Sequence, residues 1–407
     1  MDIHLHDEME QRIFDELSKM TIIDAHEHLR PEAEFIKAPM DWAWLLQYVI
    51  NDMVAAGFEG GVYFPYSEGL SPREKWEKLK PFWPAVKHGQ FARIMLLGLK
   101  EWFGVTDLNE QTIEHLDREV RRQQRAGFYK EALVRKCGIG KVISNGKTWE
   151  GYDHDFMRVI VNIPQIVCQK QLREFEQKMG RTIRSVAQLE EALAEYVERA
   201  VAAGCVGFKT VVQPVPPLPQ GIAPLVQHII DNPAIPSEAQ RQQLASWVHR
   251  RCLDAIRGKD KIVAAHAGTY ADLSSHPVNF YALMEEYRDI QFDLFHMGIP
   301  LTRETGNIAK HLPNVIVNLN GAALTSQHMF EAGLQEWLDF VPVNKVIGFG
   351  GDYQWMPQLV WGHLQIMRES FAKVFAARIR RGMIDFDASI DVLRQWLWDN
   401  PKRYYRV

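Results

Sequence analysis

Short runs of β-branched and aliphatic residues alternate with longer segments of helical periodicity along most of this 407-residue chain. Such alternation is typical of repeated strand–helix units and not of a β-sandwich or a helical bundle. The pattern predicts eight strands, at residues 21–29, 140–145, 156–167, 205–212, 261–268, 289–297, 314–321 and 345–353. Eight strands connected by helices predict an α/β protein with a (β/α)8 TIM barrel.

Two segments are too long or too rich in proline to be simple crossover helices. Residues 43–138 predict a mainly helical insertion after the first strand. Residues 213–245 begin with "QPVPPLPQGIAP", whose prolines exclude a continuous helix, and we expect a loop and helix insertion over the mouth of the barrel. Helical patterns after residue 353 predict extra C-terminal helices. Without repeats or a change in composition, we expect one domain over residues 1–407.

Composition excludes several classes of partner. The 47 basic and 51 acidic residues are mixed along the chain and give a net charge of −4, so we expect no nucleic-acid partner. No apolar run approaches the length of a membrane span, and the acidic N-terminal segment lacks the pattern of a signal peptide. The four cysteines are far apart and form no C-x-x-C pair. We therefore expect a cytoplasmic protein without membrane contacts, a homo-oligomer that acts on a small molecule.

The first predicted strand, in "TIIDAHEHLR", ends with two histidines two residues apart. Side chains alternate between the two faces of a strand, so Asp24, His26 and His28 are expected on one face and Glu27 on the other. His4 and His6 have the same spacing, but they lie in an acidic terminal segment without an apolar run and are expected to be solvated.

Later strands also end in titratable residues, at the end of a barrel where barrel enzymes place their chemistry. A single histidine at a strand end is most often a hydrogen-bonded core residue. Several histidines together with a carboxylate supply the ligands that a divalent ion such as zinc prefers. The residues concerned are Lys209 in "GFKT", His266 in "VAAHAG", His296 in "DLFHMG" and Asp352 in "GFGGDY". Together with the first strand they predict a metal site.

These motifs resemble the amidohydrolase superfamily of metal-dependent barrels, and most closely its amidohydrolase-2 group. The segments "HAGTYADL", "FHMGIPLTRETGNIAKHLPNVIVNLN", "KVIGFGGDY" and "DNPKRYYRV" occur in the order that the group leads one to expect. The group includes metal-dependent decarboxylases, lactonases and hydrolases, and domains fused to glutamine-synthetase-like enzymes. The resemblance implies a metal-dependent TIM-barrel enzyme.

The resemblance also implies roles for individual residues. His26, His28, His266 and Asp352 would bind one or two divalent ions, which we expect to be zinc. Asp352 would in addition accept the proton of the metal-activated water. His296 would polarise the substrate or the water in single-metal members of the group, or bind a second ion in two-metal members.

Lys209 leaves two interpretations open. A strand-four lysine can become carboxylated and bridge two metal ions, or it can stay charged and contact a substrate or a salt-bridge partner. The segment after it, "KTVVQPVPPLP", lacks the tyrosine–arginine pair expected of glutamine-synthetase-linked relatives.

A metal-activated water predicts a hydrolase that acts on an amide, a lactone or a related C–N or C–O bond of a small polar molecule. The alternative is a non-hydrolytic enzyme with the same site, a decarboxylase or a sugar-acid isomerase, and a barrel with a binding or regulatory role is a third hypothesis. We expect Arg303, Tyr353, Gln354 and Trp355 to lie in loops that face the pocket and bind substrate. His363 is a further candidate for the pocket wall.

Overall fold

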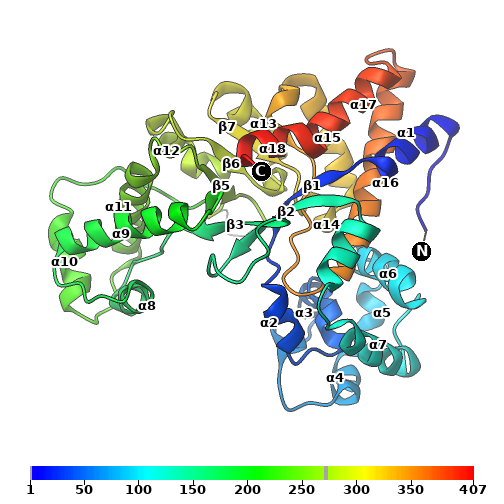
Figure 1. The fold of residues 1–407 in the computed structure, drawn as a ribbon, viewed down its shortest axis with the longest axis horizontal. Helices are drawn as coiled ribbons and strands as arrows, with labels where there is room; N and C mark the ends of the chain where they lie inside the picture. Colours follow the sequence, from blue (N-terminus) through cyan, green and yellow to red (C-terminus); the bar gives the residue numbers. More distant parts are fainter. Residues whose placement is uncertain (1, 270–273) are drawn as a thin grey trace.

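The computed structural model describes residues 2–269 and 274–407 and has a parallel β-barrel at its centre (Figure 1). The strands follow one another around the barrel in chain order, and each pairs in parallel with the next. Their bounds are β1 Ile22–Glu27, β2 Ile139–Gly146, β3 Met157–Asn162, β4 Gly207–Val211, β5 Ile262–His266, β6 Phe292–Leu294, β7 Val315–Asn318 and β8 Val346–Ile347. All eight overlap their predicted segments, which confirms the (β/α)8 barrel.

The chain after β8 closes the barrel against β1. The amide of Ala25 donates to the carbonyl oxygen of Phe349 at 3.0 Å, and the amide of Asp352 donates to the carbonyl oxygen of His26 at 2.9 Å. Gly350 lies in this seam, where a Cβ atom would come within 2.5 Å of the Cβ of Asn320 and 2.9 Å of the backbone nitrogen of His26. Only glycine fits there, which explains part of the "GFGGD" motif.

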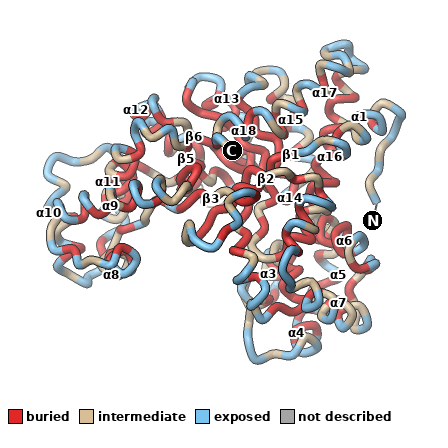
Figure 2. The backbone as a smooth tube through the Cα atoms, in the orientation of Figure 1, coloured by how far each residue is buried: buried red, intermediate tan, exposed pale blue. Residues whose placement is uncertain are grey.

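Aliphatic side chains fill the barrel. The strands at its centre are coloured mainly as buried in Figure 2. The last helix adds Tyr405, whose hydroxyl donates to Oδ2 of Asp293 on β6 at 2.7 Å. The barrel is therefore a packed core and not a pore. Buried members of this cluster include Ile23, Ala25, Ile143, Ile160, Ile262, Ile316 and Ile347.

Helices surround the barrel and form two extensions (Figure 1). Helices α8 to α11 extend to the left of the view, and α2 to α7 lie below it on the right. No helix in the described part of the chain combines the length and the apolar character needed to cross a membrane. The helices are α1 Glu8–Lys19, α2 Glu32–Lys37, α3 Val49–Ala55, α4 Pro72–Leu79, α5 Trp83–Val86, α6 Gln90–Phe103, α7 Glu110–Gln123, α8 Gln169–Met179, α9 Val186–Ala202, α10 Ala223–Asp231, α11 Glu238–Ile256, α12 Tyr281–Glu286, α13 Thr302–His311, α14 Ala322–Thr325, α15 Gln327–Phe340, α16 Gln358–Arg380, α17 Phe386–Arg394 and α18 Asn400–Tyr405.

The insertion after β1 contains helices, as predicted, and α6 fixes it to the long helix α16. The two helices cross closely, because a Cβ atom on Gly362 would come within 2.3 Å of the carbonyl oxygen of Ile94. Arg93 of α6 also forms an ion pair with Glu369 of α16, at 3.0 Å. The insertion is therefore held in place beside the barrel.

The segment 213–245 leads from β4 into the first part of α11. Its position differs from the one expected from the sequence. Its helix α10 buries Val226, Ile229 and Ile230 and packs against α8, α9 and α11. This apolar face holds the segment on the outer helices, and none of its residues lines the main cavity. The structure thus does not show the expected position over the barrel mouth.

Candidate metal centre and substrate cavity

Two histidines and an aspartate meet where the chain after β8 closes on β1. Nε2 of His26 lies 3.1 Å from Oδ1 of Asp352, and Nε2 of His28 lies 3.4 Å from the same oxygen. One donor atom from each of the three residues lies within 4.8 Å of the other two. The sequence predicted all three as metal ligands, and the fold brings them together.

A bulge in β1 changes the predicted pattern of faces. Asp24 pairs with Val142 and Glu27 with Ser144, so β1 uses three residues where β2 uses two. As a result, the carboxyl groups of Asp24 and Glu27 face each other, instead of Asp24 lying beside the imidazoles and Glu27 opposite. The expectation from simple alternation was wrong at this point.

The two carboxyl groups support the metal ligands through the backbone. Oδ1 of Asp24 accepts from the amides of His26 and Gly351, each at 3.2 Å, and Oε2 of Glu27 accepts from the amide of Tyr353 at 2.6 Å. Burial raises the pKa of Asp24 to about 7, and burial together with Asp24 raises the pKa of Glu27 well above its ordinary value. A Cβ atom on Gly351 would lie 1.9 Å from Oε1 of Glu27. The third glycine of "GFGGD" is thus needed for this contact.

Asp352 carries a negative charge in this site. Burial alone would raise the pKa of its carboxyl group, but hydrogen bonds from His26 and His28 hold the pKa well below its ordinary value. Its backbone has a φ of +67°, a left-handed conformation that is uncommon for residues other than glycine. The carbonyl oxygen of Asp352 accepts from the hydroxyl of Tyr48 and from Nε2 of Gln47. The insertion therefore helps to hold the aspartate.

The three side chains fit a divalent ion. Burial lowers the pKa of His26 well below its ordinary value, so the ring is neutral, the form that binds metals. Its Nδ1 is buried without a hydrogen-bond partner in the described part of the chain, and its Nε2 faces Asp352. Two imidazoles and a carboxylate form a donor set typical of zinc and related ions, with positions left for substrate or water.

His266 lies beside this cluster, at the end of β5, and is connected to His296. Nδ1 of His296 lies 2.9 Å from the carbonyl oxygen of Asn320, and its Nε2 lies 2.8 Å from Nδ1 of His266. A carbonyl oxygen only accepts, and burial lowers the pKa of His296 to about 4, so the neutral ring has its proton on Nδ1. His266 must then donate from Nδ1, and its Nε2 is an acceptor, 2.7 Å from Oγ1 of Thr269.

The chain of contacts behind His296 reaches the barrel core. Oδ1 of Asn320 accepts from the amide of His296 at 2.9 Å, and Oδ1 of Asn318 accepts from the amide of Asn320 at 3.0 Å. Nδ2 of Asn318 donates to Oδ2 of Asp293 at 2.9 Å. These contacts fix the ring of His296, which in turn orients His266. His296 itself does not line the main cavity. The role of His266 as a metal ligand stays a prediction. The last four residues of the "HAGTYADL" motif, 270–273, lie outside the described part of the chain.

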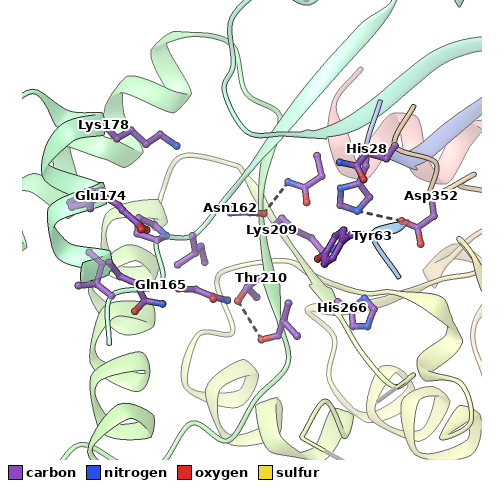
Figure 3. Close-up of a pocket in the computed structure, with 18 of the residues that line it drawn as sticks. His28, Tyr63, Asn162, Gln165, Glu174, Lys178, Lys209, Thr210, His266 and Asp352 are labelled. Carbon is purple, nitrogen blue, oxygen red and sulfur yellow. Dashed lines mark hydrogen bonds and ion pairs between the residues drawn. The ribbon is translucent and has the colours of Figure 1, made fainter. Parts of the chain in front are cut away.

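The donor cluster opens into a cavity of about 830 Å³. Figure 3 shows its two ends. The strand end contains His28, Lys209, His266 and Asp352, and the helix end contains Glu174 and Lys178 of α8. Gln171 of α8 and Tyr196 of α9 also line the cavity. The insertion after β1 supplies part of the wall, with Gln47, Tyr48, Asn51, Val62, Tyr63 and Tyr66.

Three residues predicted to bind substrate lie elsewhere. Arg303 pairs with Glu336 at 2.7 Å, its side chain is 79% exposed, and it lines a separate surface hollow. The prediction for Arg303 was wrong. The residue lies in the first turn of helix α13, and its side chain points toward α15. Tyr353 is buried beside Tyr48, and Trp355 packs against Trp44, so neither lines the main cavity.

Gln354, between these two aromatic residues, does line the cavity. His363 does not, because it is fully buried behind the site against Phe349 and Tyr353. Two asparagines that the sequence analysis did not single out do line it. Asn145 and Asn162 lie near the ends of β2 and β3, and Nδ2 of Asn145 donates to Oδ1 of Asn162 at 3.0 Å. The strand-end criterion would have found both, had amides been counted with titratable groups.

A family model described as Amidohydrolase matches residues 152–407. The chain belongs to this amidohydrolase family. This agrees with the resemblance in the sequence and with the donor cluster of His26, His28 and Asp352, since the superfamily is generally metal-dependent. Protein fluG of Emericella nidulans is 25% identical over 174 residues, a segment that spans 40% of this chain and 20% of that longer protein.

Solved structures with a similar fold match this chain over nearly its whole length. A uronate isomerase from Thermotoga maritima has a TM-score of 0.79 and 15% identity, with all of both chains covered. A glucuronate isomerase from Caulobacter crescentus has a TM-score of 0.74 and 12% identity, covering 99% of this chain and 97% of that one. A protein from Lactobacillus casei described as a metal-dependent hydrolase has a TM-score of 0.66 and 12% identity, covering 97% of each chain. At these identities the similarity shows a shared fold.

Proposed function

We propose that the protein is a metal-dependent isomerase that interconverts the aldose and ketose forms of a small sugar acid. The observation that carries the proposal is the polarity of the cavity around the donor cluster. Among the described residues that line it, half have an amide or a hydroxyl group. The residues are Gln47, Tyr48, Asn51, Tyr63, Tyr66, Asn145, Asn162, Gln165, Gln171, Tyr196, Thr210 and Gln354.

Such a wall suits a polyhydroxylated substrate, because every sugar hydroxyl both donates and accepts hydrogen bonds and amides can match either. Cavities for small ligands are usually lined by apolar and aromatic side chains with few polar groups, so this one is unusually polar. The uronate and glucuronate isomerases support the proposal, because their similarity in fold covers 100% and 99% of this chain.

The residues of the cluster can move the protons that the reaction requires. Isomerisation transfers a proton from C2 to C1 and another from the C2 hydroxyl oxygen to the C1 oxygen, with no net gain or loss of atoms. Ionised Asp352 can accept the C2 proton and return it at C1. His266, whose Nε2 is an acceptor, can take the hydroxyl proton and deliver it to the C1 oxygen. When bound, a divalent ion, zinc in our proposal, supplies a Lewis acid that polarises the substrate carbonyl.

The test is incubation of the metal-loaded protein with a panel of hexuronates in D₂O, followed by NMR. The proposal expects a ketose product with deuterium at C1, because the transferred proton exchanges with solvent on Asp352. The Asp352→Asn variant should lose this activity, while Arg303→Ala, outside the cavity, should keep it. The proposal is wrong if none of the hexuronates yields a ketose under conditions in which the protein has bound its metal.

Hydrolysis is the second candidate function, and the donor cluster favours it equally. A pair of imidazoles with an ionised carboxylate can also activate water against a carbonyl carbon. A sugar-acid lactone would satisfy the same polar wall. Hydrolysis in H₂¹⁸O would place one labelled oxygen in the product, whereas isomerisation of an aldose to a ketose forms no acid, so the two functions are separated by product analysis.

A further inference from the structure

A lysine at the strand end of the cavity has no partner for its charge. Lys209 lies on β4, between Asn162 of β3 and Ala264 of β5, and only 5% of it is exposed. Its ammonium group lies over the ring of Phe295, 4.5 Å from the ring centre. Among the described residues, no side chain or carbonyl group accepts a hydrogen bond from its Nζ or forms an ion pair with it.

The nearby carboxylates have other partners. Asp293 accepts hydrogen bonds from Asn318 and from the hydroxyl of Tyr405. Asp352 contacts His26 and His28. Both carboxylates act on Lys209 only through their electrostatic field, which partly opposes burial, and burial lowers the pKa of Lys209 to about 8. The amine therefore still carries its proton at neutral pH.

A buried, unpaired charge is costly, and proteins normally compensate it with a partner of opposite charge. We propose that Lys209 binds the carboxylate of the substrate and so makes the site selective for sugar acids over neutral sugars. The inference rests on the proposed function for the identity of the ligand. The position of Lys209 among amide-bearing neighbours, facing the cavity next to the cluster, supports it (Figure 3).

The competing interpretation, a carboxylated lysine that bridges two ions, has less support. The bridging role would need the Nζ atom to lie among the ligands, whereas it lies over the ring of Phe295. The two interpretations make different predictions for metal content.

The experiment compares two ligands that cannot isomerise. One is a C1-reduced hexuronate, which keeps the carboxylate at C6, and the other is the corresponding hexitol, which has an alcohol there. Titration calorimetry of the metal-loaded wild type should show that the acid binds at least about tenfold more tightly, because a hydrogen-bonded charge pair contributes that much or more. Equal affinity for the acid and the hexitol overturns the proposal without any variant.

The variant Lys209→Met should weaken binding of the acid by about 10- to 100-fold and change binding of the hexitol less than threefold. Lys209→Arg keeps the charge and should keep part of the preference for the acid. Lys178→Met is the matched control, because it removes a positive charge from the helix end of the same cavity. An effect of Lys178→Met on the acid as large as that of Lys209→Met would overturn the proposal.

Metal analysis separates the interpretations of Lys209. We expect the same number of ions per chain in the wild type and in Lys209→Met. Two ions per chain in the wild type and fewer in Lys209→Met, with an added carboxyl group on the lysine in native mass spectra, would overturn the proposal in favour of bridging. Because binding is measured without turnover, absence of isomerase activity would contradict the proposed function but leave the role of Lys209 to be decided by the calorimetry.

Discussion

The two ends of the cavity are built from different kinds of structure. The strand end is formed by residues at the ends of β1, β4 and β5 and after β8, and backbone hydrogen bonds across the closing seam hold the histidines and the aspartate. At the helix end, Glu174 and Lys178 are exposed side chains of α8. The loop before Tyr66 contributes Tyr63, which is 81% exposed. The comparison indicates that the strand end is held in place by the backbone of the barrel, whereas the helix end depends on side chains of the surrounding helices and loops.

Removal of the metal ligands should have the largest effect. The double variant His26→Ala/His28→Ala should lose the bound ion and reduce turnover by more than about 10³-fold, because the Lewis acid and two of its three ligands disappear. Elemental analysis and kcat measure the two losses. Chelation of the wild type should reproduce the loss of activity, and added zinc should restore it. Full turnover in the double variant would contradict a metal site at the strand end.

Disruption of the contact between His266 and His296 should have the next largest effect on turnover. His296→Phe keeps a ring of similar size but removes the acceptor that orients His266. We expect kcat to fall about 10- to 100-fold with little change in KM, since supporting contacts of this kind have effects of that size. The ion content should stay at the wild-type level, and its loss would instead place His296 among the ligands.

Gly351→Ala tests the closing seam by its effect on stability. The added methyl group would overlap Oε1 of Glu27, and overpacking of this kind typically lowers the free energy of unfolding by about 1–3 kcal/mol. Gly61→Ala is the control, because Gly61 has a φ of +75° but nothing within 4 Å of the added atom. Urea denaturation of both variants measures the difference. A loss in Gly351→Ala no larger than in Gly61→Ala would contradict the overlap with Glu27, because Gly351 has no left-handed φ that could explain the loss.

Tyr63→Ala should have a smaller effect, confined to substrate binding. An exposed aromatic ring at the cavity wall contributes about 0.5–1.5 kcal/mol to a stacked contact, so KM should rise about 2- to 10-fold. Neither the melting temperature nor kcat should change, because Tyr63 supports no buried contact of the cluster. A large fall in kcat would mean that the loop takes part in the chemistry, and the contrast between the two ends would be incorrect.

Arg303→Ala should have the smallest effect. Its ion pair with Glu336 is exposed, and such pairs contribute about 0–1 kcal/mol to stability. We expect KM and kcat to stay within twofold of the wild type. A rise in KM specific to acidic substrates would restore Arg303 to the substrate site and contradict the position described above.

The sequence predicted the strand end well and the helix end poorly, for a physical reason. Parallel strands that close into a barrel bring their C-terminal ends together whatever the loops do, so His26, His28 and Asp352 could be expected to meet. The residues that Tyr63 and Lys178 face depend on how helices from distant segments pack, and local periodicity does not contain that information.

Two details within the predictable part also escaped the sequence. The bulge between Asp24 and Glu27 inserts one residue, and period-two alternation cannot show where such an insertion occurs. Arg303 follows a strand-end motif closely, yet one turn of helix α13 is enough to direct it to the surface. Proximity in sequence to a catalytic motif was a poor guide to proximity in space.

The hydroxyl of Tyr405 closes the chain of contacts that runs through Asp293 and Asn318 to the histidine pair. The candidate ligands themselves come from the two edges of the sheet, because His26 and His28 lie on and just after β1 and Asp352 follows β8. Their donor atoms meet only when these two edges close on each other. An ion bound there would therefore also fasten the first strand to the chain after the last one.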